Sequence, residues 1–282
     1  MSDRRRWADL PRRLISAAVL AVTMLGALWA GTRVLSLVVY GITLVTIWEW
    51  LLLVTRAVPT ARQKKNSRSL ALAFLAVMAV ALGVYWVYLP QMDAHRYFLT
   101  WLVSLLGLSA LPGVLSLCRR DSTWAAPWLG AGLPYIVGAG LGMMALIVHA
   151  TSWATYLILV SIAADSGGYF AGRWIGGPKL CPQFSPKKTW SGMVGALILS
   201  AVTGGVLVAA GLVEFGMGWP LSTLLGLGLA LVAQTGDMLE SLAKRRFGAK
   251  DAGTALPGHG GFLDRVDSHL LVAWIGFVSW AV

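Results

Sequence analysis

LGAGLPYIVGAGLGMMALIVH, residues 129–149, contains no Asp, Glu, Lys or Arg. A helix needs about 20 consecutive apolar residues to cross a bilayer, and this stretch has that length. Its apolar residues follow one another continuously, whereas the strands of a membrane barrel alternate between apolar and polar residues. The stretch therefore predicts a membrane-spanning helix.

Similar apolar runs occur along the whole chain. The sequence predicts an all-α polytopic membrane protein with about nine transmembrane helices. The predicted segments are 14–30, 34–54, 70–89, 97–117, 129–149, 153–175, 193–213, 221–242 and 266–282. We divide the chain into N-terminal transmembrane helices, residues 1–150, and a C-terminal transmembrane region that carries the charged motifs, residues 151–282.

The composition agrees with a membrane protein. The 282 residues are 57% hydrophobic and 12% charged, whereas a soluble domain carries about a quarter charged residues. The net charge of +11 would suggest nucleic acid binding in a soluble protein. In a membrane protein, basic loops orient the helices and face anionic lipid headgroups, so we expect membrane lipids and no nucleic acid as partners.

The basic residues also predict the orientation. With nine segments, all Lys and Arg residues except Arg33 and Arg96 fall on the same side of the membrane. The positive-inside rule places that side, and the N-terminus, in the cytoplasm. Cys118 and Cys181 both lie in loops on this side, so no disulfide is expected, and their spacing does not suggest a zinc site.

Asp165 and Glu49 lie inside the predicted segments 153–175 and 34–54. Asp165 shares a helix face with Gly168 and Gly172, small residues that let another helix or a ligand come close. Burying its charge is costly, which favours a functional role over an Asp that a neighbouring helix satisfies. Glu49 lies near the predicted cytoplasmic end of its segment, where a structural role is favoured.

A polar linker, GGPKLCPQFSPKKTWSG at residues 176–192, precedes a predicted helix. Ser185, Lys187, Lys188 and Thr189 offer hydroxyl and ammonium groups close to a helix start, an arrangement that suits a polyphosphate. An ordinary basic loop is the equal alternative. The glycine spacing of a Walker A loop is absent, so a P-loop ATPase is not indicated.

The most polar stretch is SLAKRRFGAKDAGTALPGHGGFLDRVD, residues 241–267. Asp264 and Asp267 fall on one helix face, and Asp237 precedes the stretch by about one helical turn. Carboxylate oxygens suit Mg²⁺, which would also relieve the repulsion among these acids. The alternative is a network of salt bridges with Lys244, Arg245 and Arg265.

These motifs resemble those of the phosphatidate cytidylyltransferase (CDP-diacylglycerol synthase) family. The matching signature comprises Ser241-x-x-Lys244-Arg245, then Lys250-Asp251, Pro257-Gly-His-Gly-Gly261 and Asp264-Arg-Val-Asp267. Further matches are Arg13–Ala17, Trp48–Trp50, Asp165–Tyr169, Ser185–Trp190 and Gly236-Asp237, so that the resemblance spans the chain. Ser191 departs from the pattern, because many relatives carry an acidic or amide residue there.

The resemblance implies an enzyme that converts CTP and phosphatidic acid to CDP-diacylglycerol and pyrophosphate with Mg²⁺. It also implies a bacterial inner membrane location with a cytoplasmic active site, and it suggests a homodimer. The roles that we then expect are Mg²⁺ binding by Asp237, Asp264 and Asp267, and contact with CTP phosphates by Ser185, Lys187, Lys188 and Thr189. Lys244, Lys250 and Arg265 would neutralise the lipid phosphate or pyrophosphate, His259 would shape a phosphate-binding turn, and Asp165 would orient a lysine or touch the nucleotide.

Other classes of membrane protein remain as alternatives. A transporter or lipid flippase would place its charges near the membrane midplane, whereas here they collect at the cytoplasmic edge, apart from Asp165. A CTP-dependent polyprenol kinase would also act on an anionic lipid. A CDP-alcohol phosphotransferase would carry a denser Asp-Gly-x-x-Ala-Arg motif, which the sequence lacks.

Overall fold

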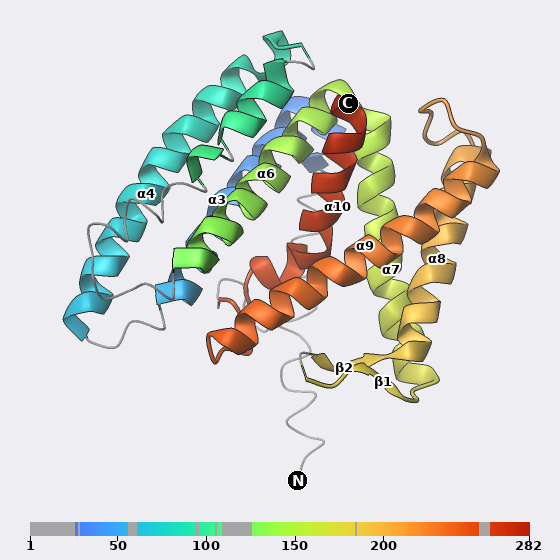
Figure 1. The fold of residues 1–282 in the computed structure, drawn as a ribbon. Coiled ribbons are helices and arrows are strands. Elements are labelled where there is room, and N and C mark those ends of the chain that lie inside the picture. The colour runs from blue at the N-terminus through green and yellow to red at the C-terminus, as the bar shows by residue number, and fades with distance from the viewer. Residues whose placement is uncertain are drawn as a thin grey trace.

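The structure is a bundle of long helices with one small hairpin (Figure 1). It is a computed structural model that describes residues 26–27, 29–55, 61–93, 96–104, 106–108, 126–183, 185–253 and 260–282. In chain order its elements are α3 (Thr32–Thr55), α4 (Ala61–Tyr88), the 3₁₀ turn η1 (Leu89–Gln91), α6 (Ala126–His149), α7 (Thr151–Trp174), β1 (Lys179–Cys181), β2 (Ser185–Thr189), α8 (Trp190–Ala209), α9 (Trp219–Arg246) and α10 (Leu263–Ala281).

Six of the described helices are long and apolar enough to cross a membrane, which agrees with a polytopic membrane protein. They are α3, the apolar part of α4, α6, α7, α8 and α9. Helix α10 is not among them, because Asp264, Arg265 and Asp267 crowd its first turns. The first predicted segment lies mostly outside the described residues, and the fourth is described only as far as Leu108. Nine helices therefore stay a prediction.

The structure differs from the expected element bounds in two places. The region between the second and third segments was predicted as a linker, but α4 already begins at Ala61. The polar linker before α8 forms an antiparallel hairpin that pairs Lys179 with Thr189 and Cys181 with Ser185. Short strands outside the apolar runs carry no membrane signal, so hydropathy alone does not predict them.

The core of the bundle is built around α6, the most enclosed of the six candidate spans. It packs against α3 on one side and α10 on the other. Val137, Met144 and Leu146 are fully buried in this core. The backbone of α6 also accepts a hydrogen bond from Trp101, whose Nε1 lies 2.8 Å from the Gly138 carbonyl oxygen.

Helices α7, α8 and α9 form a second tightly packed group (Figure 1). A Cβ atom at Gly195 of α8 would lie 2.6 Å from the carbonyl oxygen of Gly167 on α7. A Cβ atom at Gly226 of α9 would lie 2.5 Å from the carbonyl oxygen of Ser200 on α8. Only glycine allows backbones to approach so closely, and such contacts are typical of membrane helices.

The hairpin leads directly into α8. Thr189 ends β2 and is also the N-cap of α8, because its side chain accepts a hydrogen bond of 3.2 Å from the amide of Gly192. The amide of Trp190 donates to the Pro178 carbonyl at 3.1 Å, which fixes the base of the hairpin. The hairpin lies at the end of the bundle opposite the C-terminus (Figure 1), and it carries Lys187 and Lys188.

Candidate functional site

A cavity of about 590 Å³ opens where the hairpin meets α7, α9 and α10. It gathers residues that are far apart in the sequence. Its lining includes Asp165, Tyr169 and Arg173 of α7, Lys187, Lys188 and Thr189 of the hairpin, Gln234 and Asp237 of α9, and Asp264, Arg265 and Asp267 of α10. Acidic and basic side chains therefore face the same space.

Lys188 connects the hairpin to α9. Its Nζ lies 2.7 Å from Oδ2 of Asp237 and 2.9 Å from Oε1 of Gln234. The hydroxyl of Ser241, one turn further along α9, donates to Oδ1 of Asp237 at 3.3 Å. The Lys188 ammonium is thus held at the cavity wall by two side chains of one helix.

Small residues on α7 allow the hairpin and α9 to approach this helix closely. A Cβ atom at Gly172 would lie 3.0 Å from Oγ1 of Thr189, and one at Gly168 would lie 3.6 Å from Nε2 of Gln234. The prediction that Gly168 and Gly172 share the face of Asp165 and admit a close neighbour is confirmed.

Asp165 and Asp267 are joined through Ser268. The hydroxyl of Ser268 donates to Oδ2 of Asp165 at 2.8 Å, and its amide donates to Oδ1 of Asp267 at 2.8 Å. The charges of Asp237 and Asp165 repel Asp267, because all three carboxylates face the same region. A cation placed there would relieve this repulsion.

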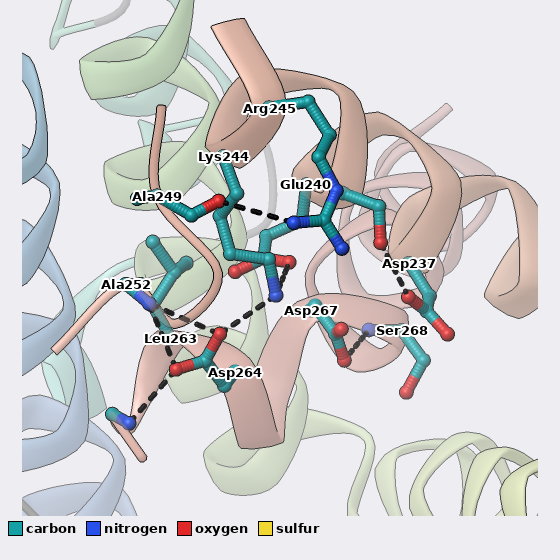
Figure 2. A network of polar contacts seen from close by, with 12 residues as sticks. Asp237, Glu240, Lys244, Arg245, Ala249, Ala252, Leu263, Asp264, Asp267 and Ser268 are labelled. Carbon is teal, nitrogen blue, oxygen red and sulfur yellow. Dashed lines mark hydrogen bonds and ion pairs between the residues drawn. The ribbon is translucent and has the colours of Figure 1, made fainter. Parts of the chain in front are cut away.

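A second cluster lies beside the cavity and is centred on Lys244 (Figure 2). Its ammonium group forms ion pairs with Glu240, one turn earlier on α9, and with Oδ1 of Asp264 at 2.7 Å. Oδ2 of Asp264 accepts hydrogen bonds from the amides of Ala252 at 3.0 Å and Gly261 at 2.8 Å. The cluster therefore ties the end of α9, the start of α10 and the connection between them.

Asp264 precedes the apolar part of α10, and its environment favours the ionised form. Burial opposes ionisation, but the hydrogen bonds from Lys244, Gly261 and Ala252 outweigh it and lower the pKa of this carboxyl. Asp264 therefore enters the cluster as a carboxylate.

The structure brings together most of the predicted site residues. Those that line the cavity are Asp165, Lys187, Lys188, Thr189, Asp237, Asp264, Arg265 and Asp267. Ser185, Lys244 and Lys250 were predicted to contact phosphates but are not among the lining residues: Lys244 is held in the cluster just described, with its side chain 12% exposed, and Lys250 is exposed. His259 lies outside the described residues.

The cavity also contains residues that the sequence interpretation missed. Gln234 lies one turn before Asp237 on the same face of α9, and this spacing was the available signal. Tyr169 entered the sequence analysis only as the end of the matching segment Asp165–Tyr169, and Arg173 only as one of the basic residues on the cytoplasmic side. Their spacing of i and i+4 on α7 places both at the cavity.

Glu49 lies away from the cavity lining and acts structurally. Its Oε2 accepts a hydrogen bond of 2.8 Å from the amide of Leu263, at the start of α10. Its carboxylate packs so closely against Gly253 and Gly261 that no Cβ atom fits at either position. The structural role that the sequence favoured for Glu49 agrees with this contact.

The carboxylates around the cavity are the candidate ligands for Mg²⁺. In the described part of the chain, no three Asp, Glu, His or Cys side chains form a group that would hold a metal ion by themselves. Mg²⁺ is usually bound by one or two carboxylates together with water and substrate phosphates. Asp237 and Asp267, which both line the cavity, fit this second arrangement. Joint binding by Asp237, Asp264 and Asp267 stays a prediction.

Fold and site together define a helical membrane protein with a polar cavity of mixed charge at one end of its bundle. The profile of the cytidylyltransferase family matches residues 11–281, so the chain belongs to this family.

Several curated relatives are similar over most of their length. A phosphatidate cytidylyltransferase of Brucella melitensis is 36% identical over 281 residues, which cover 98% of this chain and 94% of that protein. One from Haemophilus influenzae is 32% identical over 304 residues, covering 96% and 98%. One from Staphylococcus saprophyticus is 35% identical over 206 residues, covering 71% and 77%.

Proposed function

We propose that this protein transfers a cytidylyl group from CTP to phosphatidic acid, giving CDP-diacylglycerol and pyrophosphate for phospholipid synthesis. One observation carries the proposal: in a member of the cytidylyltransferase family, a single cavity joins the hairpin lysines to the carboxylates of α9 and α10. The names of the relatives support the choice of phosphatidate as acceptor.

The reaction needs charge neutralisation more than a strong base. A phosphate oxygen of phosphatidic acid is already ionised at neutral pH, and it forms a bond to the α-phosphorus of CTP. The bond from that phosphorus to the pyrophosphate oxygen breaks, and pyrophosphate leaves. Both reactants are anions, so the protein must hold cations on each side of the α-phosphate and align the two groups.

The hairpin is suited to the triphosphate. Lys187 and Lys188 line the cavity immediately before α8 begins, and the first amides of a helix favour anions. Thr189 lines the same wall, although its hydroxyl also caps α8. Lys188 would exchange its contact with Asp237 for a phosphate oxygen when the nucleotide arrives. Arg265 lies on the α10 side, where it would neutralise the leaving pyrophosphate or the lipid phosphate.

Mg²⁺ is the proposed cofactor, with Asp237 and Asp267 as its protein ligands. When bound, it would neutralise charge on the phosphates of both reactants and of the leaving group. Asp165 would support this pair indirectly, because it holds Ser268 and thereby the first turns of α10.

We further propose that the protein lies in a bacterial inner membrane with the cavity facing the cytoplasm. The basic residues of the hairpin and of the end of α9 support this orientation, because positively charged loops stay on the cytoplasmic side. CTP is made in the cytoplasm and would reach the cavity directly. The homodimer suggested by the family resemblance stays a prediction.

Purified protein incubated with labelled CTP and phosphatidic acid, with and without Mg²⁺, tests the proposed function. We expect equal amounts of CDP-diacylglycerol and pyrophosphate, and neither product after chelation of the metal. A transporter would leave CTP intact. A polyprenol kinase would release CDP instead of pyrophosphate and would require a polyprenol.

A further inference from the structure

The last two turns of α7 present a tyrosine and an arginine at the rim of the cavity. Nη1 of Arg173 donates a hydrogen bond of 2.9 Å to the hydroxyl of Tyr169, and the guanidinium carbon lies 5.8 Å from the centre of the Tyr169 ring. Both residues line the cavity. Arg173 forms no ion pair with a carboxylate of any described residue, so its charge is available to a ligand.

The outer surface next to this pair is apolar. Trp174 is 82% exposed and Ile175 is 75% exposed, and Phe170 packs against Trp174 with ring centres 5.8 Å apart. Exposed aromatic side chains at the end of a membrane helix are typical of the membrane–water interface. Arg173 therefore lies between the polar cavity and a surface that faces lipid.

The apolar outer surface continues along α7 towards the middle of the membrane. Leu159 and Ile162 are both exposed on this helix. From Ile162 to Arg173 the helix rises roughly 16 Å, about half of the ~30 Å hydrocarbon core. A lipid in one leaflet would place its acyl chains beside Ile162 and its phosphate beside Arg173.

The chemistry of the pair suits a phosphate monoester. The planar guanidinium group binds two phosphate oxygens at once and stays charged at every physiological pH. The Tyr169 hydroxyl accepts from Arg173, and its own proton remains available for a phosphate oxygen. Lys188, by contrast, is already engaged by Asp237 and Gln234.

We infer that Arg173 and Tyr169 bind the phosphate of the lipid substrate at the side of the cavity that opens to the membrane, leaving Lys187 and Lys188 to the triphosphate. The inference rests on the proposed function and divides the cavity between its two substrates. It also explains selection of phosphatidic acid, because lipids with a phosphodiester offer one fewer ionisable oxygen to the guanidinium.

Kinetics in mixed micelles test this division. The variants are Arg173→Gln, Arg173→Lys and Tyr169→Phe, with Arg246→Gln as the matched control, because Arg246 is an exposed arginine in the last turn of α9 that does not line the cavity. Loss of a charged hydrogen bond predicts a roughly ten- to hundredfold higher KM for phosphatidic acid in Arg173→Gln. The KM for CTP should stay the same. Arg173→Lys should recover part of the loss, Tyr169→Phe should show a smaller rise, and Arg246→Gln should behave as the wild type.

A binding measurement without CTP separates this inference from the proposed function. Spin-labelled phosphatidic acid in phosphatidylcholine nanodiscs should show an immobilised fraction with the wild type and with Arg246→Gln, and a smaller one with Arg173→Gln. Unchanged binding and an unchanged KM for phosphatidic acid in Arg173→Gln overturn the inference, as does a rise in the KM for CTP alone. If Arg173→Gln does not insert, wild-type values in both Arg173→Lys and Tyr169→Phe overturn it. A wild type that binds the labelled lipid but makes no CDP-diacylglycerol refutes only the proposed reaction.

Discussion

Two lysine–carboxylate clusters lie within a few turns of each other on α9, and they differ in what they face. In the first, Lys188 pairs with Asp237, whose side chain is 28% exposed at the cavity wall. In the second, Lys244 pairs with Glu240 and with Asp264, whose side chain is 8% exposed. Both charged side chains of the first cluster line the cavity, whereas in the second cluster only Asp264 does, and Lys244 and Glu240 hold α9 and α10 together behind it. Helix α9 thus contributes one carboxylate to the cavity and another to the contact with α10.

Asp237→Asn should have the largest effect and should act on turnover alone. Loss of this carboxylate removes the partner of Lys188 and one proposed metal ligand, so we expect activity to fall on the order of 10³-fold. The thermal stability in detergent should remain that of the wild type, because the side chain is partly exposed. Pyrophosphate release and a melting curve measure the two quantities.

The exposed Asp93 is the control for this change, because its only ion pair in the described part of the chain is with Arg96 at 3.5 Å. Asp93→Asn should change neither quantity. Wild-type turnover in Asp237→Asn would show that the reaction needs neither the carboxylate of Asp237 nor its ion pair with Lys188.

Lys244→Met should act mainly on stability. It leaves Glu240 and Asp264 buried without their cation, and removing one partner of a buried pair costs about 3 kcal/mol or more. Unfolding by a denaturing detergent should therefore begin at a lower concentration. The double variant Lys244→Met with Glu240→Met should recover part of the loss, because the amides of Ala252 and Gly261 still satisfy Asp264. If Lys244→Met were as stable as the wild type but had a higher KM for CTP or phosphatidic acid, Lys244 would instead contact that substrate.

Gln234→Leu tests how the first cluster positions its lysine. Without the amide oxygen 2.9 Å away, Lys188 keeps Asp237 but loses its second side-chain partner. We expect the KM for CTP to rise roughly tenfold, with a smaller change in kcat. The adjacent Thr235 is exposed, so Thr235→Ala is the control. An unchanged KM for CTP would show that the side chain of Gln234 is not needed to orient Lys188, which keeps Asp237 and the backbone carbonyl oxygen of residue 234 at 3.4 Å.

Thr189→Val should have the smallest effect. It removes the side-chain cap of α8, which is usually worth about 1 kcal/mol of stability. Thr189→Ser keeps the oxygen and should retain the melting temperature of the wild type. Equal melting temperatures in the two variants would show that the cap contributes nothing to the stability of α8.

The sequence predicted the membrane helices well because their signal is local. Continuous apolar runs gave α6 and α8 to within a few residues, and charge spacing on α9 and α10 gathered Asp237, Asp264 and Asp267 around one region. The resemblance to the cytidylyltransferases is confirmed by the family profile.

What escaped prediction depends on contacts between distant segments. Lys244 and Lys188 look alike in the sequence, and only the packing of the helices places Lys188 in the cavity lining and Lys244 outside it, against Glu240 and Asp264. The contact of Glu49 with Leu263 joins residues more than 200 positions apart. Charge patterns report which residues are polar, whereas tertiary structure decides which of them water and ligands can reach.

The glycine contacts among α7, α8 and α9 limit how the cavity can respond to a nucleotide. Backbones that touch at Gly167 and Gly195, and again at Gly226 and Ser200, leave no free volume through which one helix could slide past its neighbour. Admission of the triphosphate must therefore depend on rotation of long side chains such as Lys187, which is exposed and can change rotamer within nanoseconds, and Lys188, which must first leave Asp237. The helices keep their positions, and only a few long side chains that line the cavity change conformation when a substrate binds.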